Sequence, residues 1–232
     1  MAKMIYRDPT GLARVVIIML SLCLFFDSVS AVSDILEAQL ISNVIEGVEM
    51  TEEMADSNDN RQLTIGFINM GNIVITSLIF LKWNYRICRN AHYFSSESQR
   101  HKPGWAVGFY FVPFANLIYP FQAIKDALTT FIIQNQMDEY NDDRTSPVFV
   151  WWIVWIIGGI LGLLHDKFAS NADDLKTMLY VSVTGCFLNL FFVFSDIAAI
   201  LMVNTLTNAC VACKQNSSGE EDEEFFKSEE TI

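Results

Sequence analysis

Four long apolar runs constrain this chain more than any other feature. A helix needs about 20 apolar residues to cross the ~30 Å hydrocarbon layer of a bilayer, at about 1.5 Å per residue. Runs of about that length occupy residues 15–33, 63–81, 148–164 and 178–203. Because lipid offers no hydrogen-bond partner to the backbone, each run is expected to be helical. The sequence therefore predicts an all-α integral membrane protein with four transmembrane helices.

Two acidic segments, residues 34–59 and 220–230, carry most of the acidic residues behind the net charge of −12. The second follows a Ser-Ser-Gly stretch at 217–219 and has the composition of a solvated, disordered tail. We therefore expect a polytopic membrane domain over residues 1–214 and an acidic disordered tail over residues 215–232. No stretch combines clustered cations with aromatic residues on a soluble face, so no nucleic-acid partner is expected.

The basic residues are distributed unevenly between the predicted spans. With four spans, 12 of the 15 Lys and Arg residues lie on the side of the N-terminus, and Arg61, Lys167 and Lys176 lie on the other. The positive-inside rule therefore places the N-terminus in the cytoplasm and favours four spans over five. A cleavable signal peptide is the alternative for the first run, because small residues stand at 29–31. The apolar pattern continues past Ala31, and we expect the first span to be retained.

A shorter apolar segment is divided by Pro103, Pro113 and Pro120. The fifteen residues from 105 to 119 would reach only about 22 Å as a helix, too short to cross the bilayer. Pro113 also removes a helical hydrogen bond, so the helix should break there. We expect residues 103–133 to form a re-entrant or interfacial element ending in an amphipathic helix. Neighbouring spans should cover the break, because lipid cannot pair its free backbone groups.

Uncommon residues at set spacing surround these prolines. They are Trp83, Arg86, Asn90, Pro103, Gly104, Trp105, Gly108, Phe111, Pro113, Asn116, Leu117 and Pro120. On these residues the chain resembles a bacterial membrane family named domain of unknown function 4328. A tryptophan-rich run at 151–155 and the final run at 197–207 extend the resemblance from the first span to about Gln215. The resemblance implies a multi-pass protein of the bacterial plasma membrane and assigns no activity.

Within this motif, Arg86 and Asn90 lie four residues apart on a helix that continues the second span, so they share a face. Trp83 lies one turn earlier, and the three residues would form a belt at headgroup level, with the cation near phosphate. Two interpretations remain open. The face binds a lipid headgroup or another anionic ligand beside the Pro-Gly-Trp segment, or it is an anchor that fixes the depth of the helix and pins the adjacent loop.

Polar residues inside the apolar runs are the other candidates for a site. They are Asp27, Asn69, Asn72, Asn189 and Asp196, with Asn69 and Asn72 on one face and Asn189 and Asp196 on another. An ionisable group inside a membrane suggests ion or proton handling, for which Asp196 is the best candidate. Interhelical hydrogen bonding is the alternative. Asp27 lies near the end of its run, where water would reach it. The spacing of Gly158 and Gly162 predicts a close helix approach.

Catalytic and metal-binding patterns are weak in this sequence. Cys210 and Cys213 have redox or zinc spacing but lack a second ligand pair, and their position just past a span allows lipidation. The three histidines lack metal-ligand spacing, and no phosphate loop, nucleophile elbow or HExxH motif is present. We therefore expect no enzyme activity, cofactor or metal.

The sequence favours a non-catalytic membrane interaction or assembly module. Its partners would be the lipid bilayer and other membrane proteins or further copies of itself. The alternative is a small transporter or channel that uses Asp196 and the asparagine-bearing faces. A transporter would favour an internal repeat and paired broken helices, whereas the sequence has one broken segment.

Overall fold

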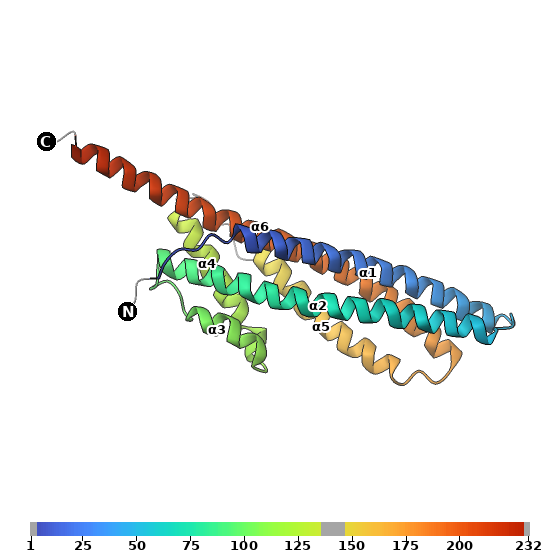
Figure 1. Cartoon of the computed structure of the whole chain (residues 1–232). Helices are drawn as coiled ribbons and strands as arrows, with labels where there is room; N and C mark the ends of the chain where they lie inside the picture. Colours follow the sequence, from blue (N-terminus) through green and yellow to red (C-terminus); the bar gives the residue numbers. More distant parts are fainter. Residues whose placement is uncertain (1–3, 136–146, 230–232) are drawn as a thin grey trace. The chain divides into compact units, whose positions relative to one another are not determined.

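The computed structural model describes residues 4–135 and 147–229, with side chains as far as Ser218. Within these ranges every regular element is helical (Figure 1). The elements are α1 (Thr10–Ile45), α2 (Glu52–Phe94), α3 (Pro103–Gly108), two 3-10 turns (Phe109–Phe111 and Ala115–Leu117), α4 (Tyr119–Gln134), α5 (Pro147–Ala169) and α6 (Leu175–Glu229). The prediction of an all-α fold is confirmed.

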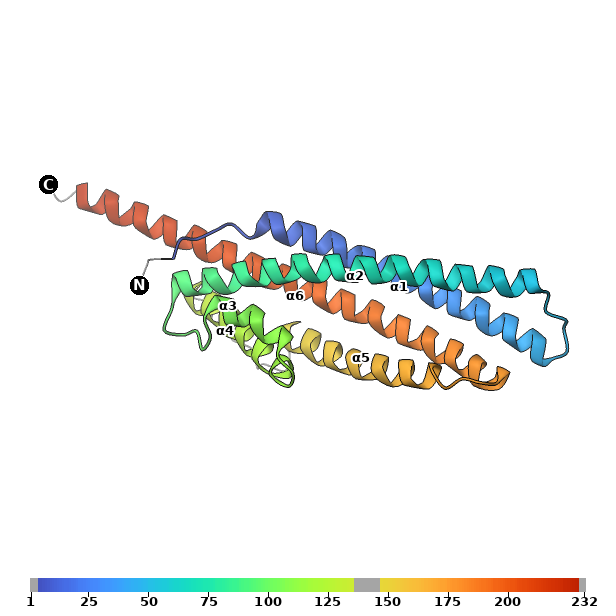
Figure 2. The ribbon, with the colours of Figure 1, turned by 60° about the horizontal axis from the view of Figure 1, so that its bottom comes forward.

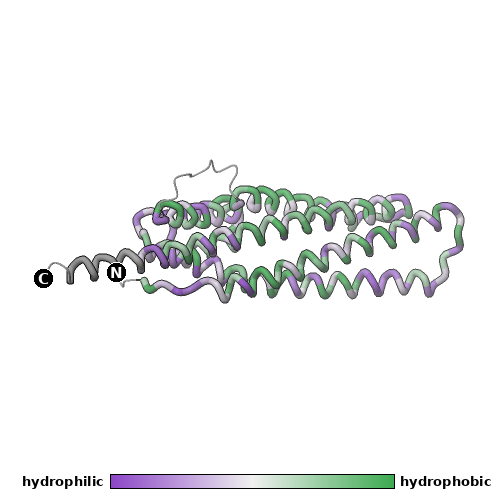
Figure 3. Tube along the Cα trace, turned by 90° about the horizontal axis from the view of Figure 1, so that it is seen from above, coloured by the Kyte–Doolittle hydropathy of each residue, from purple (hydrophilic) through white to green (hydrophobic). Residues whose placement is uncertain are grey.

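Each predicted span lies inside one of the long helices α1, α2, α5 and α6. These four are long and apolar enough to cross a membrane, and a fifth crossing is added if the bent α3–α4 pair counts as one span. Hydrophobic residues dominate the helices, and hydrophilic ones gather towards their ends (Figure 3). The helices are longer than the apolar runs because the polar flanks continue the helical backbone.

The chain divides into two compact units. Unit 1 comprises residues 1–17, 78–150 and 201–232, and unit 2 comprises residues 18–77 and 151–200. Both units contain parts of α1, α2, α5 and α6. Each unit is described by itself below.

In unit 2, the parts of α1, α2, α5 and α6 follow one another along the chain, and each runs antiparallel to the one before it. Figures 1 and 2 both show α1 alongside α2, with a short connection between them. Gly47 ends α1 at a φ of +94°, and the Val48 N–H donates to the Asn43 carbonyl at 2.9 Å. This is a Schellman cap, which needs the conformational freedom of glycine at that position.

At the α5 glycines, where a close helix approach was predicted, the neighbour is an aromatic side chain. A Cβ placed on Gly158 would lie 3.1 Å from the Phe192 ring, and one on Gly162 would lie 3.7 Å from it. The Phe192 side chain therefore packs over the glycine face of α5. Larger residues at Gly158 would push the ring away, because packed interiors leave little spare volume.

Unit 1 has its core around Trp83, which is 0% exposed. The Trp83 Nε1 donates to Thr207 Oγ1 at 3.1 Å. The other fully buried residues of the unit include Ile87, Ala91, Ile124, Phe131, Met202 and Leu206. The structure therefore places the Trp83 ring inside the unit and not on its surface. The part of α2 beyond its apolar run packs against other helices, and the Trp83 indole lies in the core that they form.

The proline segment breaks where it was predicted to break. The two helical parts, Pro103–Phe111 and Ala115–Gln134, are bent by 115° relative to each other. Phe114 in the break has a φ of +63°, the one positive φ of a non-glycine residue in the described ranges. Local bonds pair the freed backbone, since the Ala115 and Asn116 N–H groups donate to the Pro113 and Val112 carbonyls at 2.7 and 3.0 Å.

Within unit 1, the described helices leave the break exposed, contrary to expectation. Pro113 is exposed and Asn116 is half-buried. Phe111 and Phe114 are 73% and 83% exposed. Cover was expected because a break in the helix would leave backbone groups unpaired. The short 3-10 turns pair most of these groups locally, so the backbone needs less cover from other helices.

The acidic C-terminal stretch differs from the expected disordered tail. Helix α6 continues without a break through residues 215–229. Glu and Lys have high helix propensity, and the Ser-Ser-Gly stretch does not end the helix. Lys3, Arg144 and residues 230–232, which entered the charge and tail predictions, lie outside the described residues.

Candidate functional sites

A polar column runs through the interior of unit 2. It consists of Cys23, Asp27, Asp34 and Glu37 on α1 together with their hydrogen-bond partners on α2 and α6, and with His165 of α5, which interacts electrostatically with Asp34. These four residues share a helix face, because they are spaced by three, four or seven positions. Fourteen residues of helix correspond to about 21 Å, roughly two thirds of a hydrocarbon layer.

The first level of the column joins two carboxyl groups. Asn69 Nδ2 donates to Asp27 Oδ1 at 2.8 Å. The Asp27 and Asp196 carboxyl groups also contact each other through a side-chain hydrogen bond. Asp27 is 5% exposed, so the expectation that water reaches it is wrong. The structure thus joins Asn69 and Asp196, two of the predicted candidates, through a residue that the sequence had discounted.

Two buried oxygens at this level lack hydrogen-bond partners among the described residues, Asn69 Oδ1 and Asp196 Oδ2. The Asn69 Oδ1 is an acceptor, and the Asp196 Oδ2 is an acceptor when its carboxyl is ionised. Neither oxygen has a donor among the described residues of the site. Two carboxylates in contact away from water cannot both carry a negative charge without a compensating positive charge. The level is therefore chemically suited to hold a proton or a small cation.

The second level lies at Asp34. Asn189 Nδ2 donates to Asp34 Oδ2 at 2.8 Å, and His165 of α5 interacts electrostatically with the same carboxylate. A Cβ on Gly185 would lie 2.9 Å from Asp34 Oδ2 and 3.3 Å from His165 Nε2. Gly185 therefore makes room on α6 for a carboxylate and an imidazole. Imidazole is the side chain that most readily exchanges protons near neutral pH.

The third level lies towards the α1–α2 connection. Glu37 accepts hydrogen bonds from Ser182 Oγ at 2.8 Å and from Asn58 Nδ2 at 3.0 Å. Arg61 donates through Nη2 to Asn58 Oδ1 at 2.6 Å and through Nε to Ser33 Oγ at 3.0 Å. This level is a connected network of polar groups, in which the Asn58 amide bonds to both the Glu37 carboxylate and the Arg61 guanidinium.

Two surface cavities reach the column at this end of unit 2. One of about 410 Å³ lies between α1 and α6, and its lining includes Asp34, Gln39, Ser42 and Ser182 beside apolar residues. The other, of about 390 Å³, lies between α1 and α2 and is lined in part by Asn58 and Arg61. The second and third levels are thus accessible from the surface of the unit.

The fourth level is formed by Cys23 and two residues of α2. Asn72 Nδ2 donates to Cys23 Sγ at 3.1 Å, and Thr76 Oγ1 lies 3.5 Å from the same sulfur. All three side chains are buried. The predicted face of Asn69 and Asn72 is therefore turned towards α1, where each residue meets a different partner.

Unit 1 places the Arg86–Asn90 part of the motif against the N-terminal segment. Asn90 is 0% exposed, and its Nδ2 donates to the Arg7 carbonyl at 2.7 Å and to Cys210 Sγ at 3.4 Å. Arg86 Nη1 donates to the Asp8 carbonyl at 2.9 Å. These two motif residues hold residues 7–8 in place, whereas the interpretation as an anchor had expected them to pin the adjacent loop.

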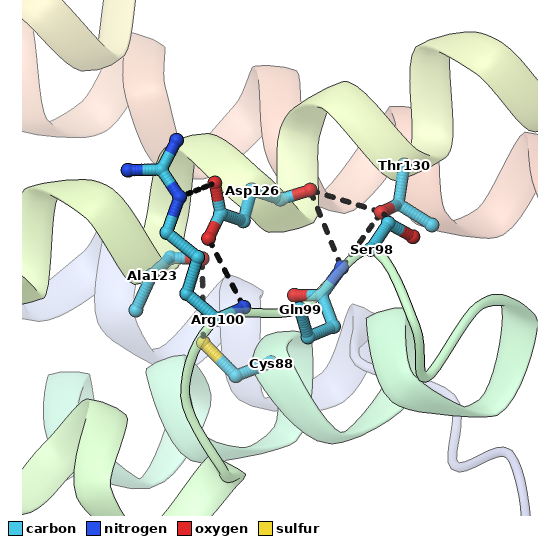
Figure 4. Close-up of polar contacts among 7 residues, drawn as sticks. All are labelled: Cys88, Ser98, Gln99, Arg100, Ala123, Asp126 and Thr130. Atoms are coloured by element: carbon cyan, nitrogen blue, oxygen red, sulfur yellow. Dashed lines mark hydrogen bonds and ion pairs between the residues drawn. The ribbon is translucent and has the colours of Figure 1, made fainter.

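The loop before α3 is fixed to α4 by a second network (Figure 4). Asp126 accepts from the backbone N–H of Arg100 at 3.4 Å through Oδ2, and its Oδ1 lies 3.4 Å from Arg100 Nε. Gln99 Nε2 donates to Thr130 Oγ1 at 2.7 Å. Asp126 and Thr130 are 8% and 2% exposed. The loop that leads into the Pro-Gly-Trp block is therefore held by buried partners.

The remaining motif residues mostly shape this region. Pro103 and Pro120 are buried near the starts of α3 and α4, where a missing N–H costs nothing. Gly104 is exposed, Gly108 is half-buried, and Trp105 is 57% exposed. Trp105 thus presents its ring on the surface of the unit.

The cysteine pair is a packing feature in this structure. Cys210 and Cys213 are 0% and 2% exposed, and Cys213 Sγ donates to the Phe131 carbonyl at 3.1 Å. Burial contradicts the expectation that their position allows lipidation. Within the described residues, no group of three or more His, Cys, Asp or Glu side chains is arranged to hold a metal ion.

Sequence reasoning missed Asp34, Glu37, His165 and Asp126. A signal for the first of these exists, since Asp27 and Asp34 are seven residues apart, as are Asn189 and Asp196. On antiparallel helices such equal spacings bring the residues into contact in pairs. Asp126 had no comparable signal, because it sits on the polar side of an amphipathic pattern.

Comparison with known proteins gives one family. No curated protein and no solved structure matches the chain significantly. The family model described as Domain of unknown function (DUF4328) matches residues 46–208, which is more than half of the chain. The match includes every motif residue from Trp83 to Pro120 but begins after α1, later than the resemblance had suggested. The chain therefore belongs to the DUF4328 family of membrane proteins.

Proposed function

We propose that this protein handles protons or small monovalent cations across the membrane, through the polar column of unit 2. The observation that carries the proposal is the contact between the Asp27 and Asp196 carboxyl groups, beside the unpaired oxygens of Asn69 and Asp196. An ionisable pair inside apolar helices is costly, and such pairs are typical of ion and proton pathways. The transporter alternative thus gains support over the assembly module.

Three further features support this function. The Asp34–His165 level offers a second exchange site about ten ångströms along α1, given seven residues at about 1.5 Å each. Two cavities reach the column near Asp34 and Arg61. Gly185 keeps the carboxylate and the imidazole close together, and its replacement by any larger residue would require Asp34 to move.

The test is a flux assay with purified protein in liposomes. A pH gradient is imposed, and an internal pH dye reports proton entry in the presence and absence of sodium and potassium gradients. We expect entry faster than in protein-free vesicles and a fall to their level in Asp196→Asn. Asp174→Asn is the matched control, because Asp174 is an exposed carboxylate that caps α6.

The outcomes separate the carried ions. Flux that persists without sodium and potassium assigns protons, and flux that requires one of them assigns that cation. If the wild-type protein moves neither protons nor labelled sodium or potassium faster than empty vesicles do, the proposal is wrong. It is also wrong if Asp196→Asn and Asp174→Asn behave alike.

The assembly module remains a second candidate, favoured by the loop around Phe114. This bulky residue is 83% exposed although its φ is +63°, a conformation that L side chains rarely adopt. Backbone strain of this kind is found where structure serves a function. A photo-crosslinking phenylalanine at position 114 should capture a protein partner or a second copy, whereas the same probe at exposed Phe187 should not.

We further propose that the protein resides in the plasma membrane of a bacterium with its N-terminus in the cytoplasm. The resemblance to a bacterial family and the distribution of basic residues support this placement. A reporter that is active only in the cytoplasm, fused at the N-terminus, tests the orientation.

A further inference from the structure

We propose that the surface cavity before and along α3 binds a phosphate-bearing anion. The cavity has a volume of about 370 Å³ and is lined by Arg100, His101, Lys102, Trp105 and Phe109. Three consecutive residues with cationic or imidazole side chains thus face the same hollow as two aromatic rings. The proposal concerns unit 1 alone and does not rest on the proposed transport function.

The cation that anchors the cavity is held in place before any ligand arrives. Asp126 engages the Arg100 backbone N–H and Nε, so the main chain and the inner part of the side chain are fixed. Figure 4 shows the two terminal nitrogens of the guanidinium pointing away from Asp126. The Arg100 side chain is 55% exposed. A planar fork of this kind recognises phosphate oxygens well, and preorganisation lowers the entropy lost on binding.

The floor of the cavity is aromatic. The His101 ring lies 5.0 Å from the Phe109 ring and 5.2 Å from the Tyr119 ring, centroid to centroid, and Trp105 lies 5.3 Å from Phe109. The His101 Nε2 is buried and has no hydrogen-bond partner among the described residues.

The cations that line the cavity favour a tetrahedral phosphate group, either in the headgroup of an anionic phospholipid or as free phosphate. Trp105 is 57% exposed, and exposed tryptophan beside cations is typical of the headgroup level of a membrane. Phe111 and Phe114 are exposed farther along the same segment. This gradient from cations to apolar rings matches the order of a phospholipid from headgroup to chains.

The experiment titrates the purified full-length protein in neutral detergent with short-chain phosphatidylglycerol, short-chain phosphatidylcholine or inorganic phosphate. Thermal unfolding reports binding. Lys102→Gln carries the test, because Lys102 has no role in holding the loop, whereas Arg100→Gln would also release Asp126. The matched control is Lys176→Gln, an exposed lysine in unit 2.

We expect Lys102→Gln to weaken binding about fivefold and Lys176→Gln to leave it unchanged. Stabilisation by phosphatidylglycerol alone assigns a lipid headgroup, and equal stabilisation by inorganic phosphate assigns the free anion. The proposal is overturned if both variants titrate like the wild type, or if phosphatidylcholine binds as well as phosphatidylglycerol without dependence on Lys102. Circular dichroism of each variant verifies that it is folded.

Discussion

The side-chain amide of Asn90 pairs with both backbone polar groups of Arg7, although 83 residues separate them. Its Oδ1 accepts from the Arg7 N–H at 3.1 Å, and its Nδ2 donates to the Arg7 carbonyl at 2.7 Å. An amide is the one uncharged side chain that can offer a donor and an acceptor in this geometry. Asn90 therefore holds the N-terminal segment as a neighbouring strand would.

Replacing Asn90 by Ala should release this segment. The Arg7 backbone would lose two part-buried hydrogen bonds, at a cost of about 0.5–1.5 kcal/mol each. Limited proteolysis should then cleave after Arg7 faster than in the wild type. Asn60→Ala, at an exposed position on α2, should leave the cleavage rate unchanged. Equal rates for the two variants would contradict the role of Asn90.

Acid should loosen the start of α1 through Asp8. Hydrogen bonds from the Thr10 Oγ1 at 2.6 Å and N–H at 2.9 Å hold the pKa of Asp8 below its usual value. The stabilisation is complete above the unfolded pKa of about 4 and is lost as pH falls through the lower folded pKa. The protection of the Thr10 amide against hydrogen exchange should fall only in that acidic range. Asp8→Ala should show fast exchange at every pH, since a lost cap costs about 1 kcal/mol.

Two substitutions at Asp196 distinguish the effect of this carboxyl on folding from its effect on ion flux. Asp196→Asn keeps a hydrogen-bonding side chain and should insert and fold like the wild type. Asp196→Leu leaves Asp27 without that partner and should lower stability by about 1 kcal/mol. Thermal unfolding of both variants in detergent makes the comparison. A wild-type unfolding temperature for the leucine variant would show that the contact contributes nothing to stability.

The strained position at Phe114 predicts an unusual ranking of variants. Phe114→Gly and Phe114→Ala both remove the ring, but only glycine adopts a φ of +63° freely. The glycine variant should therefore be more stable than the alanine variant by about 1 kcal/mol. Chemical denaturation of the pair in the same detergent gives the difference. An alanine variant as stable as the glycine variant would mean that the break relaxes to another conformation.

The side of the membrane on which α3 and α4 lie can be measured directly. Cysteines introduced at Gly104 and Gln122 should both react with an impermeant reagent from the cytoplasmic side, as a re-entrant or interfacial element requires. A reporter fused after Gln215 should likewise be active in the cytoplasm. Labelling of Gly104 and Gln122 positions from opposite sides would show that the segment crosses and that there are five spans.

The membrane class, the four long helices and the break at Pro113 follow from the sequence itself. The length of an apolar run and the missing N–H of proline are local properties, so no knowledge of neighbours is needed to interpret them. The motif around Pro103 to Pro120 identified the family for the same reason. The break could be placed, but its exposure could not, because cover depends on what other helices do.

Only the tertiary structure decided which polar groups meet. A face bearing Asn189 and Asp196 is compatible with several partner helices, and the antiparallel arrangement of α1 and α6 selects Asp34 and Asp27. The neighbours of Trp83 in the sequence suggested an interfacial residue, yet its indole donates to Thr207, which lies 124 residues away along the chain. Hydrophobicity is additive along a chain and can be summed from the sequence, whereas a hydrogen bond requires two atoms within about 3 Å. Helix order and register bring those atoms together, and these depend on packing of the whole chain.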